Sequence, residues 1–441
     1  MDESSLAAMF EQAVSARPPT PDLVTNALQT GRKLRMRHHI KVAIATIAGI
    51  GIVAAVAPTA LGSLKHPAPV PATGRWAPET LFVADHGGTV TPIRVGATTA
   101  GRRIQINTVP GAATPMATTA SGRVVYVSSG SGTVTPIYTT TGKAGAPIQA
   151  TRALLSDLVV APDGRKAYAI ANSSGIVPVN LVTRRPGKLI RDFYAGQLTM
   201  TPNGATLYVA DRLAGVIPIR TATDTKLRPI PHTTYVLAMA KNSKTVYLTC
   251  VPFASITCSN SGGSIIPVST ATNTARKAIQ VPGRILQLVV AANGTTAYAL
   301  TASALNGQQF EPAKVIPVNL ATGAVGTAIR IPSTQIPSAI AITPNGETLY
   351  IASGQAQGFG HRAFITPLST ATNTLLKRIS YADEAVSFLT VTPDGSIAYF
   401  GLSPDFSANT KNYVVGIRTA TNKAGKRIPV AGGSNAEIVT P

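Results

Sequence analysis

The sequence has few charged residues, few aromatic residues and almost no cysteine, and each shortage excludes a class of protein. Charged residues make up 13% of the 441 residues and hydrophobic ones 44%, whereas a disordered chain would show the opposite balance. Two cysteines cannot staple a small disulfide-rich fold. Glycine does not recur at every third position, which excludes a collagen-like chain. A globular chain punctuated by 38 glycines and 33 prolines remains.

Residues 42–64 (VAIATIAGIGIVAAVAPTALGSL) form an uncharged run. As a helix this run would rise about 34 Å, enough to cross a hydrocarbon core of about 30 Å. A basic cluster, GRKLRMRHHIK, precedes it, and only Lys65 follows closely. The positive-inside rule therefore predicts a single-pass transmembrane helix, with residues 1–41 in the cytoplasm and the remainder outside the cell.

A secretory signal peptide is the alternative interpretation of the same run. Ala55-Val56-Ala57 matches the small-x-small cleavage pattern, and Pro58 disfavours a straight helix. In that case the chain would be secreted after cleavage near Ala57. The 41-residue leader is long for a signal peptide, which favours the retained anchor. Both interpretations export everything that follows.

The segments on either side of the apolar run have simple expected roles. Residues 1–41 are predicted to be a largely disordered cytoplasmic tail, or a tail with a short amphipathic docking helix. Residues 65–78 (KHPAPVPATGRWAP) contain four prolines and predict a stiff, extended spacer. The spacer would hold a domain away from the membrane.

Residues 79–441 repeat one pattern of four short strands. The pattern is a strand ending in a TPxG turn, a strand with an aromatic residue, a strand with a central proline, and a strand around isoleucine. The aromatic positions are Phe82, Tyr126, Tyr168, Tyr208, Tyr247, Tyr298, Tyr350 and Tyr399. The proline positions are Pro92, Pro136, Pro178, Pro218, Pro267, Pro317 and Pro367, with Gly416 in the eighth copy. The isoleucine positions are Ile104, Ile148, Ile190, Ile230, Ile279, Ile329, Ile379 and Ile428.

A period of 40 to 50 residues with four strands per repeat predicts an all-β fold, a β-propeller of four-stranded blades. Eight repeats can be counted, with seven as the alternative if one copy is irregular. Turns such as Pro202-Asn203-Gly204 suit tight hairpins, so their Asp and Asn residues are expected to form turns and not to bind ligands. The final SNAEIVTP (434–441) copies the first strand of the pattern and is predicted to complete the first blade.

A proline in a strand with neighbours on both sides should remove a ladder hydrogen bond, so we expect a bulge at this position. The units TPNGETLYIA, VIPV and TATNT (270–274 and 370–374) resemble the YVTN-type propeller repeat family. The chain departs from the eponymous strand, with YVAD at 208–211. The resemblance implies an exported bacterial propeller, and with the tail, anchor and composition it is similar to proteins of high-GC Gram-positive bacteria. Some propellers of this kind are lactonases, but no lactonase residue set can be placed on this sequence.

The loop between the aromatic strand and the proline strand is longer in the last four copies. It spans ten residues from aromatic to proline in copies one to four, and 17 to 20 in copies five to eight. Long loops on a rigid scaffold commonly bind partners, although surface loops also drift neutrally. The candidate binding residues at the edges of these insertions are Lys314, His361, Arg362 and Lys411. Cys250 and Cys258 lie in the first of these insertions and are expected to form a disulfide outside the cell.

The sequence offers little that indicates an enzyme, and no catalytic, cofactor-binding or metal site is expected. G-x-S-x-G, H-E-x-x-H and P-loop motifs are absent from the sequence. The formal net charge of +21 indicates a polyanionic partner, or solubility with protection of edge strands. Many basic residues lie beside the isoleucine strand, which is outermost in propellers that resemble this one. These residues are Arg102, Arg103, Lys188, Lys226, Arg228, Arg276, Lys277, Lys377, Arg378, Lys426 and Arg427.

The sequence thus predicts a monomeric, membrane-anchored propeller outside the cell that binds a protein or an anionic cell-wall polymer. No nucleic-acid partner is expected, because the repeat uses most of the tyrosines and the domain is exported. A hydrolase or lactonase with its site in the propeller channel is the alternative. Such an enzyme would bring at least two carboxylates, or a histidine and an acid, together in the channel.

Overall fold

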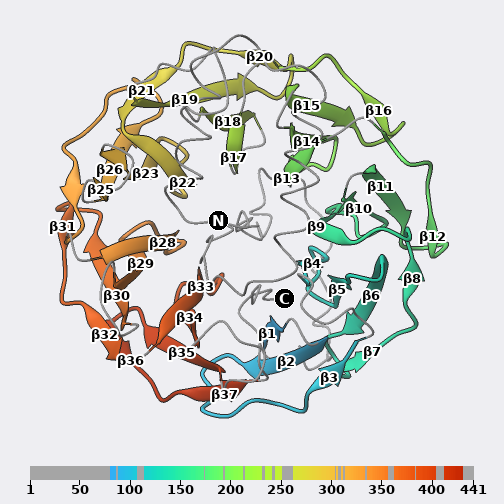
Figure 1. The fold of residues 1–441 in the computed structure, drawn as a ribbon, viewed down its shortest axis with the longest axis horizontal. Helices are drawn as coiled ribbons and strands as arrows, with labels where there is room; N and C mark the ends of the chain where they lie inside the picture. The colour runs from blue at the N-terminus through green and yellow to red at the C-terminus, as the bar shows by residue number, and fades with distance from the viewer. Residues whose placement is uncertain are drawn as a thin grey trace, which may run out of the picture. The chain divides into compact units, whose positions relative to one another are not determined.

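The propeller is an all-β ring of eight blades, and no helix occurs in the part of the chain that the structure describes (Figure 1). A computed structural model describes residues 80–85, 88–106, 114–172, 174–191, 194–211, 214–230, 234–240, 244–250, 262–302, 304–305, 309–310, 313–332, 335–355, 362–382, 384–403 and 412–430. The count of eight blades from the sequence is therefore confirmed. The predicted tail, membrane span and spacer lie outside these residues.

Blades one to four have short, regular strands. The first blade contains β1 (Thr80–Ala84), β2 (Thr89–Arg94) and β3 (Ile104–Gln105). The second contains β4 (Met116–Thr118), β5 (Val124–Ser128), β6 (Thr133–Tyr138), β7 (Lys143–Ala144) and β8 (Ile148–Gln149). The third contains β9 (Leu155–Val160), β10 (Lys166–Ala171), β11 (Gly175–Asn180) and β12 (Arg185–Pro186). The fourth contains β13 (Ala195–Met200), β14 (Thr206–Asp211), β15 (Gly215–Arg220) and β16 (Thr225–Lys226).

Blades five to eight repeat the order with longer strands. The fifth contains β17 (Thr234–Met239), β18 (Thr245–Cys250), β19 (Gly262–Ser269), β20 (Thr274–Ala275) and β21 (Ile279–Pro282). The sixth contains β22 (Arg284–Val290), β23 (Thr296–Ala302), β26 (Lys314–Asn319) and β27 (Ile329–Arg330), with the hairpin β24 (Ala304–Leu305) and β25 (Gln309–Phe310). The seventh contains β28 (Gln335–Ile342), β29 (Thr348–Gln355), β30 (Arg362–Ser369), β31 (Thr374–Leu375) and β32 (Ile379–Ala382). The eighth contains β33 (Ala385–Val391), β34 (Ile397–Ser403), β35 (Asn412–Arg418), β36 (Lys423–Ala424) and β37 (Ile428–Val430).

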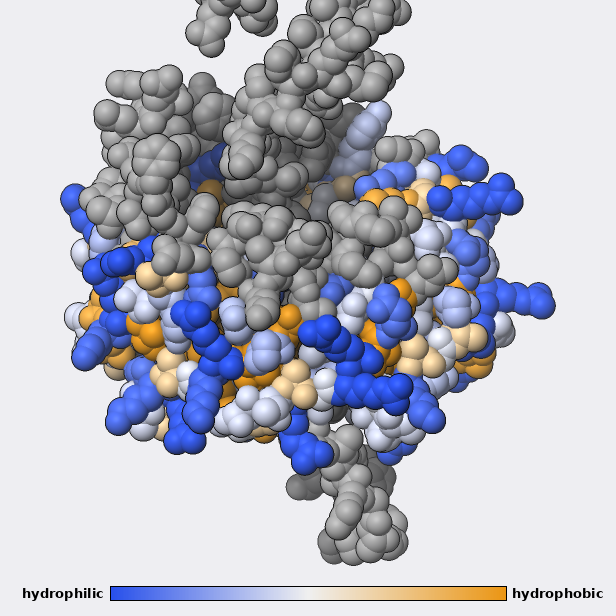
Figure 2. All heavy atoms as spheres, turned by 60° about the horizontal axis from the view of Figure 1, so that its bottom comes forward, coloured by the Kyte–Doolittle hydropathy of each residue, from blue (hydrophilic) through white to orange (hydrophobic). Residues whose placement is uncertain are grey.

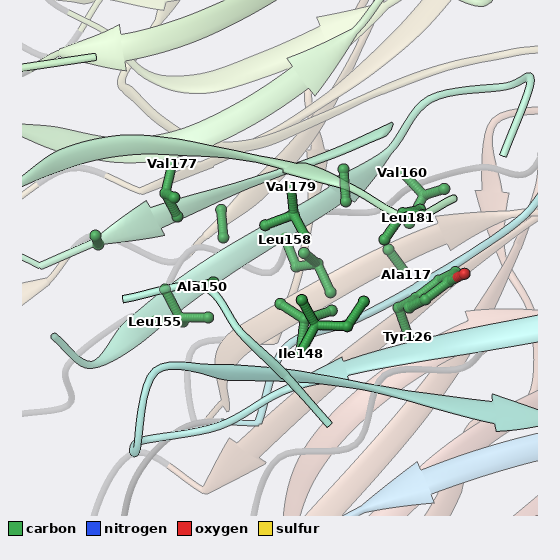
Figure 3. Packing of buried hydrophobic residues seen from close by; sticks show 14 residues of the cluster. Ala117, Tyr126, Ile148, Ala150, Leu155, Leu158, Val160, Val177, Val179 and Leu181 are labelled. Carbon is green, nitrogen blue, oxygen red and sulfur yellow. The ribbon is translucent and has the colours of Figure 1, made fainter. Parts of the chain in front are cut away.

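The core of the ring consists of eight hydrophobic clusters, each between two consecutive blades. Figure 3 shows the cluster between the second and third blades, where Tyr126 and Ile148 face Leu158. Successive side chains of a strand point to opposite faces, so one strand serves two clusters. In β14, Leu207 and Val209 pack toward the third blade and Tyr208 packs toward the fifth. Both faces are therefore buried, which explains why the aromatic strands read as nearly continuous apolar runs.

The last cluster closes the ring. Leu81 and Val83 of the first blade pack with Tyr399 and Ile428 of the eighth. The backbone N–H of Gly96 also donates a hydrogen bond of 3.0 Å to the Tyr399 hydroxyl. The first blade has three described strands, and residues 434–441, which are predicted to complete it, lie outside the described part. Core packing between the two ends thus closes the ring among the residues that are described.

The repeated proline lies opposite a break in the outer strand. Tyr208 is the cross-strand partner of Pro218, and the carbonyl of Pro218 accepts a 2.8 Å hydrogen bond from the N–H of Leu227. The same bond joins Pro136 to Gly145 and Pro317 to Gly326, and Gly416 makes it in the eighth blade. The missing N–H would also point toward the outer strand, which is interrupted here. The expected irregularity is real, but it lies in the outer strand and not in the proline strand.

A second repeated contact joins the tyrosines of four blades, Tyr168, Tyr208, Tyr298 and Tyr350, to the next blade. The turn after the proline strand contains a left-handed residue, with φ between 52° and 58° at Arg184, Asp224, Asn273, Asn373 and Asn422. The hydroxyl of Tyr350 donates to Oδ1 of Asn422 at 2.6 Å, and that of Tyr168 donates to Oδ1 of Asp224 at 2.5 Å. We call this contact the tyrosine clasp. It connects neighbouring blades outside their apolar clusters.

Candidate functional site

The ring has two unlike ends. The turn rim carries the connections from first to second strand and from third to outer strand, such as 161–165 and 181–184 in the third blade. The loop rim carries the connections from second to third strand, such as 172–174. On the turn rim, the Asp163 and Asn203 side chains accept hydrogen bonds from backbone N–H groups two residues ahead. These residues are turn formers, as their sequence context predicted.

At the loop rim, paired strands extend farthest in blade seven. β14 and β15 have six residues each, whereas β29 and β30 have eight. The additional pair, Gly354 with Ala363, lies at the loop-rim end. Blades five, six and eight have the same number of pairs beyond the aromatic position as blades three and four. Among the described residues, strand pairing therefore extends the loop rim in blade seven.

Two of the four sequence-predicted binding residues are described, and each is the first residue of a third strand. Lys314 is the first residue of β26 and is partly buried, with Thr301 and Arg330 as its strand partners. Arg362 is the first residue of β30, is exposed and pairs with Ala382. Both lie at the loop rim of neighbouring blades. His361 and Lys411 lie outside the described residues.

A polar and aromatic cluster at the junction of blades seven and eight was not anticipated from the sequence. The Glu384 carboxylate is buried, and its Oε1 forms an ion pair with Nη1 of Arg427 at 2.9 Å. The Arg427 guanidinium lies over Tyr381 at 5.2 Å and over Tyr413 at 5.5 Å from the ring centroids. Tyr381 also contacts Phe400, with 5.6 Å between the ring centroids. We call these five residues the junction cluster.

The surroundings of Tyr381 in the junction cluster keep its hydroxyl protonated. Burial raises the pKa of the Tyr381 hydroxyl, the nearby Arg427 lowers it, and the Glu384 carboxylate raises it. The Arg427 side chain remains 43% exposed although it is held by an acid and two rings. The arrangement presents a positioned guanidinium at the surface. The sequence contained a weak signal for this cluster, since Tyr381 and Tyr413 fall outside the repeated aromatic position.

The polar side chains of the inner strands serve the scaffold. Oδ2 of Asp157 on β9 accepts a 2.7 Å hydrogen bond from the Leu198 N–H on the inner strand of the next blade. Oε1 of Gln287 on β22 accepts a 2.6 Å bond from the Ile340 N–H in the same way. A β-bulge falls at this level in several inner strands, for example between Ala195 and Gln197. These side chains therefore pair with edge N–H groups of the adjacent blade.

Asp157 is the inner-strand acid with a displaced pKa. Desolvation raises the pKa of its carboxyl from 3.8 to about 6, and the hydrogen bonds from Leu198 and Leu158 partly oppose the rise. Such a shift can mark a catalytic acid. Here both oxygens accept backbone N–H groups, at 2.7 Å and 2.8 Å. Throughout the described blades, no group of three or more His, Cys, Asp or Glu residues could hold a metal ion.

Two other expectations concern residues that carry no structural description. The side chain of Cys250 and the whole of Cys258 lie outside the described residues, so their disulfide remains a prediction. The predicted membrane span at 42–64 is likewise outside. Within the described blades, no helix is long and apolar enough to cross a membrane.

The comparisons with known proteins support the fold alone. No protein-family model matches the chain, and no curated protein is similar to it in sequence. The solved structure of hydrazine synthase from Kuenenia stuttgartiensis is 17% identical with a TM-score of 0.50, covering 73% of this chain and 95% of that one. The dihydro-heme d1 dehydrogenase NirN in complex with DHE is 13% identical with a TM-score of 0.64, covering 83% of this chain and 77% of that one. In sum, the chain is similar to these proteins in its β-propeller architecture.

Proposed function

We propose that the chain is a membrane-anchored propeller outside the cell that acts as a binding or scaffold module for a protein or a cell-wall polymer. The long connections between the second and third strands in blades five to eight carry this proposal. In blade seven the strands that lead into this connection are extended, and Arg362 is exposed beside it. Rigid scaffolds with long loops on one face are well suited to recognition.

The inner strands favour binding over catalysis. Asp157 and Gln287 accept N–H groups of the next blade, which gives these polar side chains a structural role. The two solved neighbours are named as a synthase and a dehydrogenase, but at 17% and 13% identity their likeness to this chain extends to the fold alone. The channel hydrolase or lactonase is therefore not the function we favour. Membership of the YVTN-type repeat family is part of the same proposal.

Crosslinking with a matched control tests the binding surface. A photoreactive amino acid at Arg362, on the loop rim of blade seven, should form adducts with a partner on intact cells. The same group at Ala371, exposed on the turn rim of the same blade, should not. Replacing 356–361 and 404–411 by the short turn of blade three, which leaves position 362 and the paired strands in place, should abolish the adducts while thermal unfolding stays cooperative. Unchanged adducts after this replacement would refute the loop-rim proposal.

The anchor is tested separately. Membranes from cells that make the full chain should retain it through a carbonate wash, because a 23-residue apolar span resists extraction. A cysteine at Ala371 should react with a membrane-impermeant maleimide on intact cells. A soluble product whose N-terminus lies near Ala57 would show that the run is a cleaved signal, and that would overturn the anchor while leaving the binding proposal in place.

A further inference from the structure

Pairs of basic residues recur at one place on the outer wall of the ring where the first and last blades meet. In blades seven, eight and one, a basic pair comes directly before the isoleucine of the outer strand. These pairs are Lys377-Arg378, Lys426-Arg427 and Arg102-Arg103, and all six residues are exposed. Figure 2 faces this wall, which carries β3, β36 and β37 in Figure 1, and hydrophilic side chains cover much of it. We call these six residues the seam patch.

Protection of an edge strand does not explain the seam patch. The equivalent pair is Ala146-Pro147 in the second blade and Thr327-Ala328 in the sixth. These blades present the same kind of outer edge without a basic pair at this place. The third, fourth and fifth blades have one basic residue each at this place, Lys188, Arg228 and Lys277, and Arg276 directly precedes Lys277. A basic pair directly before the isoleucine therefore occurs in blades seven, eight and one, and the outer edge does not require it.

The backbone holds each basic pair between two fixed points. Before each pair, an N–H group binds the carbonyl at the proline position: Gly101 to Pro92 at 2.7 Å, Leu376 to Pro367 at 2.8 Å and Gly425 to Gly416 at 2.8 Å. After each pair, an isoleucine packs inward, with Ile104 at 7% and Ile428 at 2% exposure. The pairs thus recur at the same place on three consecutive blades.

Two of the three arginines next to the isoleucines are also held by their side chains. The Arg378 guanidinium lies 4.9 Å from the ring centroid of Phe364. Arg427 is held by Glu384, Tyr381 and Tyr413, as described above. A long side chain that is already ordered loses less conformational entropy when it binds an anion. A guanidinium also matches the geometry of phosphate oxygens.

We propose that the seam patch binds a linear polyanion with repeated phosphate groups, which lies along the outer wall across blades seven, eight and one. One basic pair on each blade suits a chain of repeating anions. The wall is convex, so a flexible polymer can follow all three pairs, whereas a flat lipid surface would meet fewer of them. This surface is separate from the loop rim, and the inference holds whether or not the loop rim binds.

The test uses the full chain in neutral detergent with labelled linear inorganic polyphosphate as the probe. The seam variant carries Arg102→Gln, Arg103→Gln, Lys377→Gln and Lys426→Gln, which spares Arg378 and Arg427 with their ring contacts. The control variant carries Lys188→Gln, Arg228→Gln, Arg276→Gln and Lys277→Gln, and so removes the same charge from blades three to five. Both should keep the unfolding temperature of the parent.

We expect the seam variant to bind at least tenfold more weakly at physiological salt, because it loses phosphate contacts. Each lost contact also lowers the slope of log affinity against log salt concentration by about one. The control should lose less than threefold. Equal losses in both variants, or binding that does not respond to salt, would overturn the proposal. The proposal would also be overturned if anionic vesicles displaced the protein completely from polyphosphate that is present in excess. The surface would then be a lipid site.

A footprint on the unaltered chain gives an independent measurement. Polyphosphate should protect Lys377 and Lys426 from acetylation, as read by mass spectrometry, and should leave Lys188 and Lys277 reactive. Protection of all four lysines to the same degree would mean that the charge acts diffusely, and the seam patch would then be no site.

Discussion

The hydroxyl of Tyr208 in the fourth blade donates a 2.6 Å hydrogen bond to Oδ1 of Asn273 in the fifth. Tyr208 is fully buried, and desolvation raises the pKa of its hydroxyl to about 12, so it stays a donor at neutral pH. Asn273 has φ of 55°, a conformation that asparagine tolerates better than most residues. The repeated TATNT motif thus supplies an acceptor for the tyrosine of the preceding blade.

The side chains of Tyr208 and Asn273, which form a tyrosine clasp, should be energetically coupled. Asn273→Gly keeps the backbone conformation and removes the acceptor, so we expect a loss of about 1 to 2 kcal/mol in the free energy of unfolding. In a double-mutant cycle with Tyr208→Phe, the coupling should be about 1 kcal/mol. Denaturant unfolding measures both. Additive effects of the two substitutions would argue against the clasp, and the natural pair Phe82 and Gly142, which lacks both groups, is the internal reference.

The raised pKa of Asp157 predicts a pH dependence of stability. Between 3.8 and about 6 the folded protein holds a proton that the unfolded chain has released, so this residue lowers stability as pH rises through that window. Asp157→Asn should abolish this contribution. The stability difference between parent and variant should change by at most about 3 kcal/mol from pH 4 to pH 7, in favour of the variant at pH 7. A difference that does not vary with pH would mean that the carboxyl titrates normally.

The ion pair between Glu384 and Arg427 should stabilise the junction of blades seven and eight. Arg427→Gln leaves a buried carboxylate without its guanidinium, and we expect a loss of about 1 to 3 kcal/mol, below the value for a fully buried pair because Arg427 is 43% exposed. The double variant Glu384→Gln with Arg427→Gln should recover part of this loss. Urea unfolding at neutral pH provides the comparison. If the double variant is less stable than Arg427→Gln alone, the carboxylate does not depend on this partner.

The place of the repeated proline leads to a matched pair of substitutions in the fourth blade. Pro218→Ala should cost about 1 kcal/mol or less, because its carbonyl bond to Leu227 is kept and the main loss is chain stiffness in the unfolded state. Val209→Pro, on the central strand β14, should cost about 3 kcal/mol or more, because it removes a ladder bond. Thermal unfolding separates the two outcomes. Similar losses would mean that the outer-strand break does not accommodate the proline.

The repeat pattern was sufficient to predict the blades, because each copy contains its own turns and its own alternation. Tyr208, Pro218 and Ile230 occupy the predicted central, third and outer positions. The candidate site was predicted less completely. Arg362 was found at the edge of a long loop, whereas the pairing of Glu384 with Arg427 was not anticipated. Arg427 lies more than forty residues away in the next copy, and no spacing rule connects the two.

By itself, the sequence determined the class of fold, the number of blades and the turns. These features depend on residues within one copy, and local chain geometry links them. Only the tertiary structure decided which residues of different copies lie beside one another. Ring closure places the first blade beside the eighth, which brings Arg102 and Arg103 to the same wall as Lys426 and Arg427. It also sets Tyr168, Tyr208, Tyr298 and Tyr350 against an acceptor in the following blade, because such contacts depend on how whole blades pack and not on the order of residues along the chain.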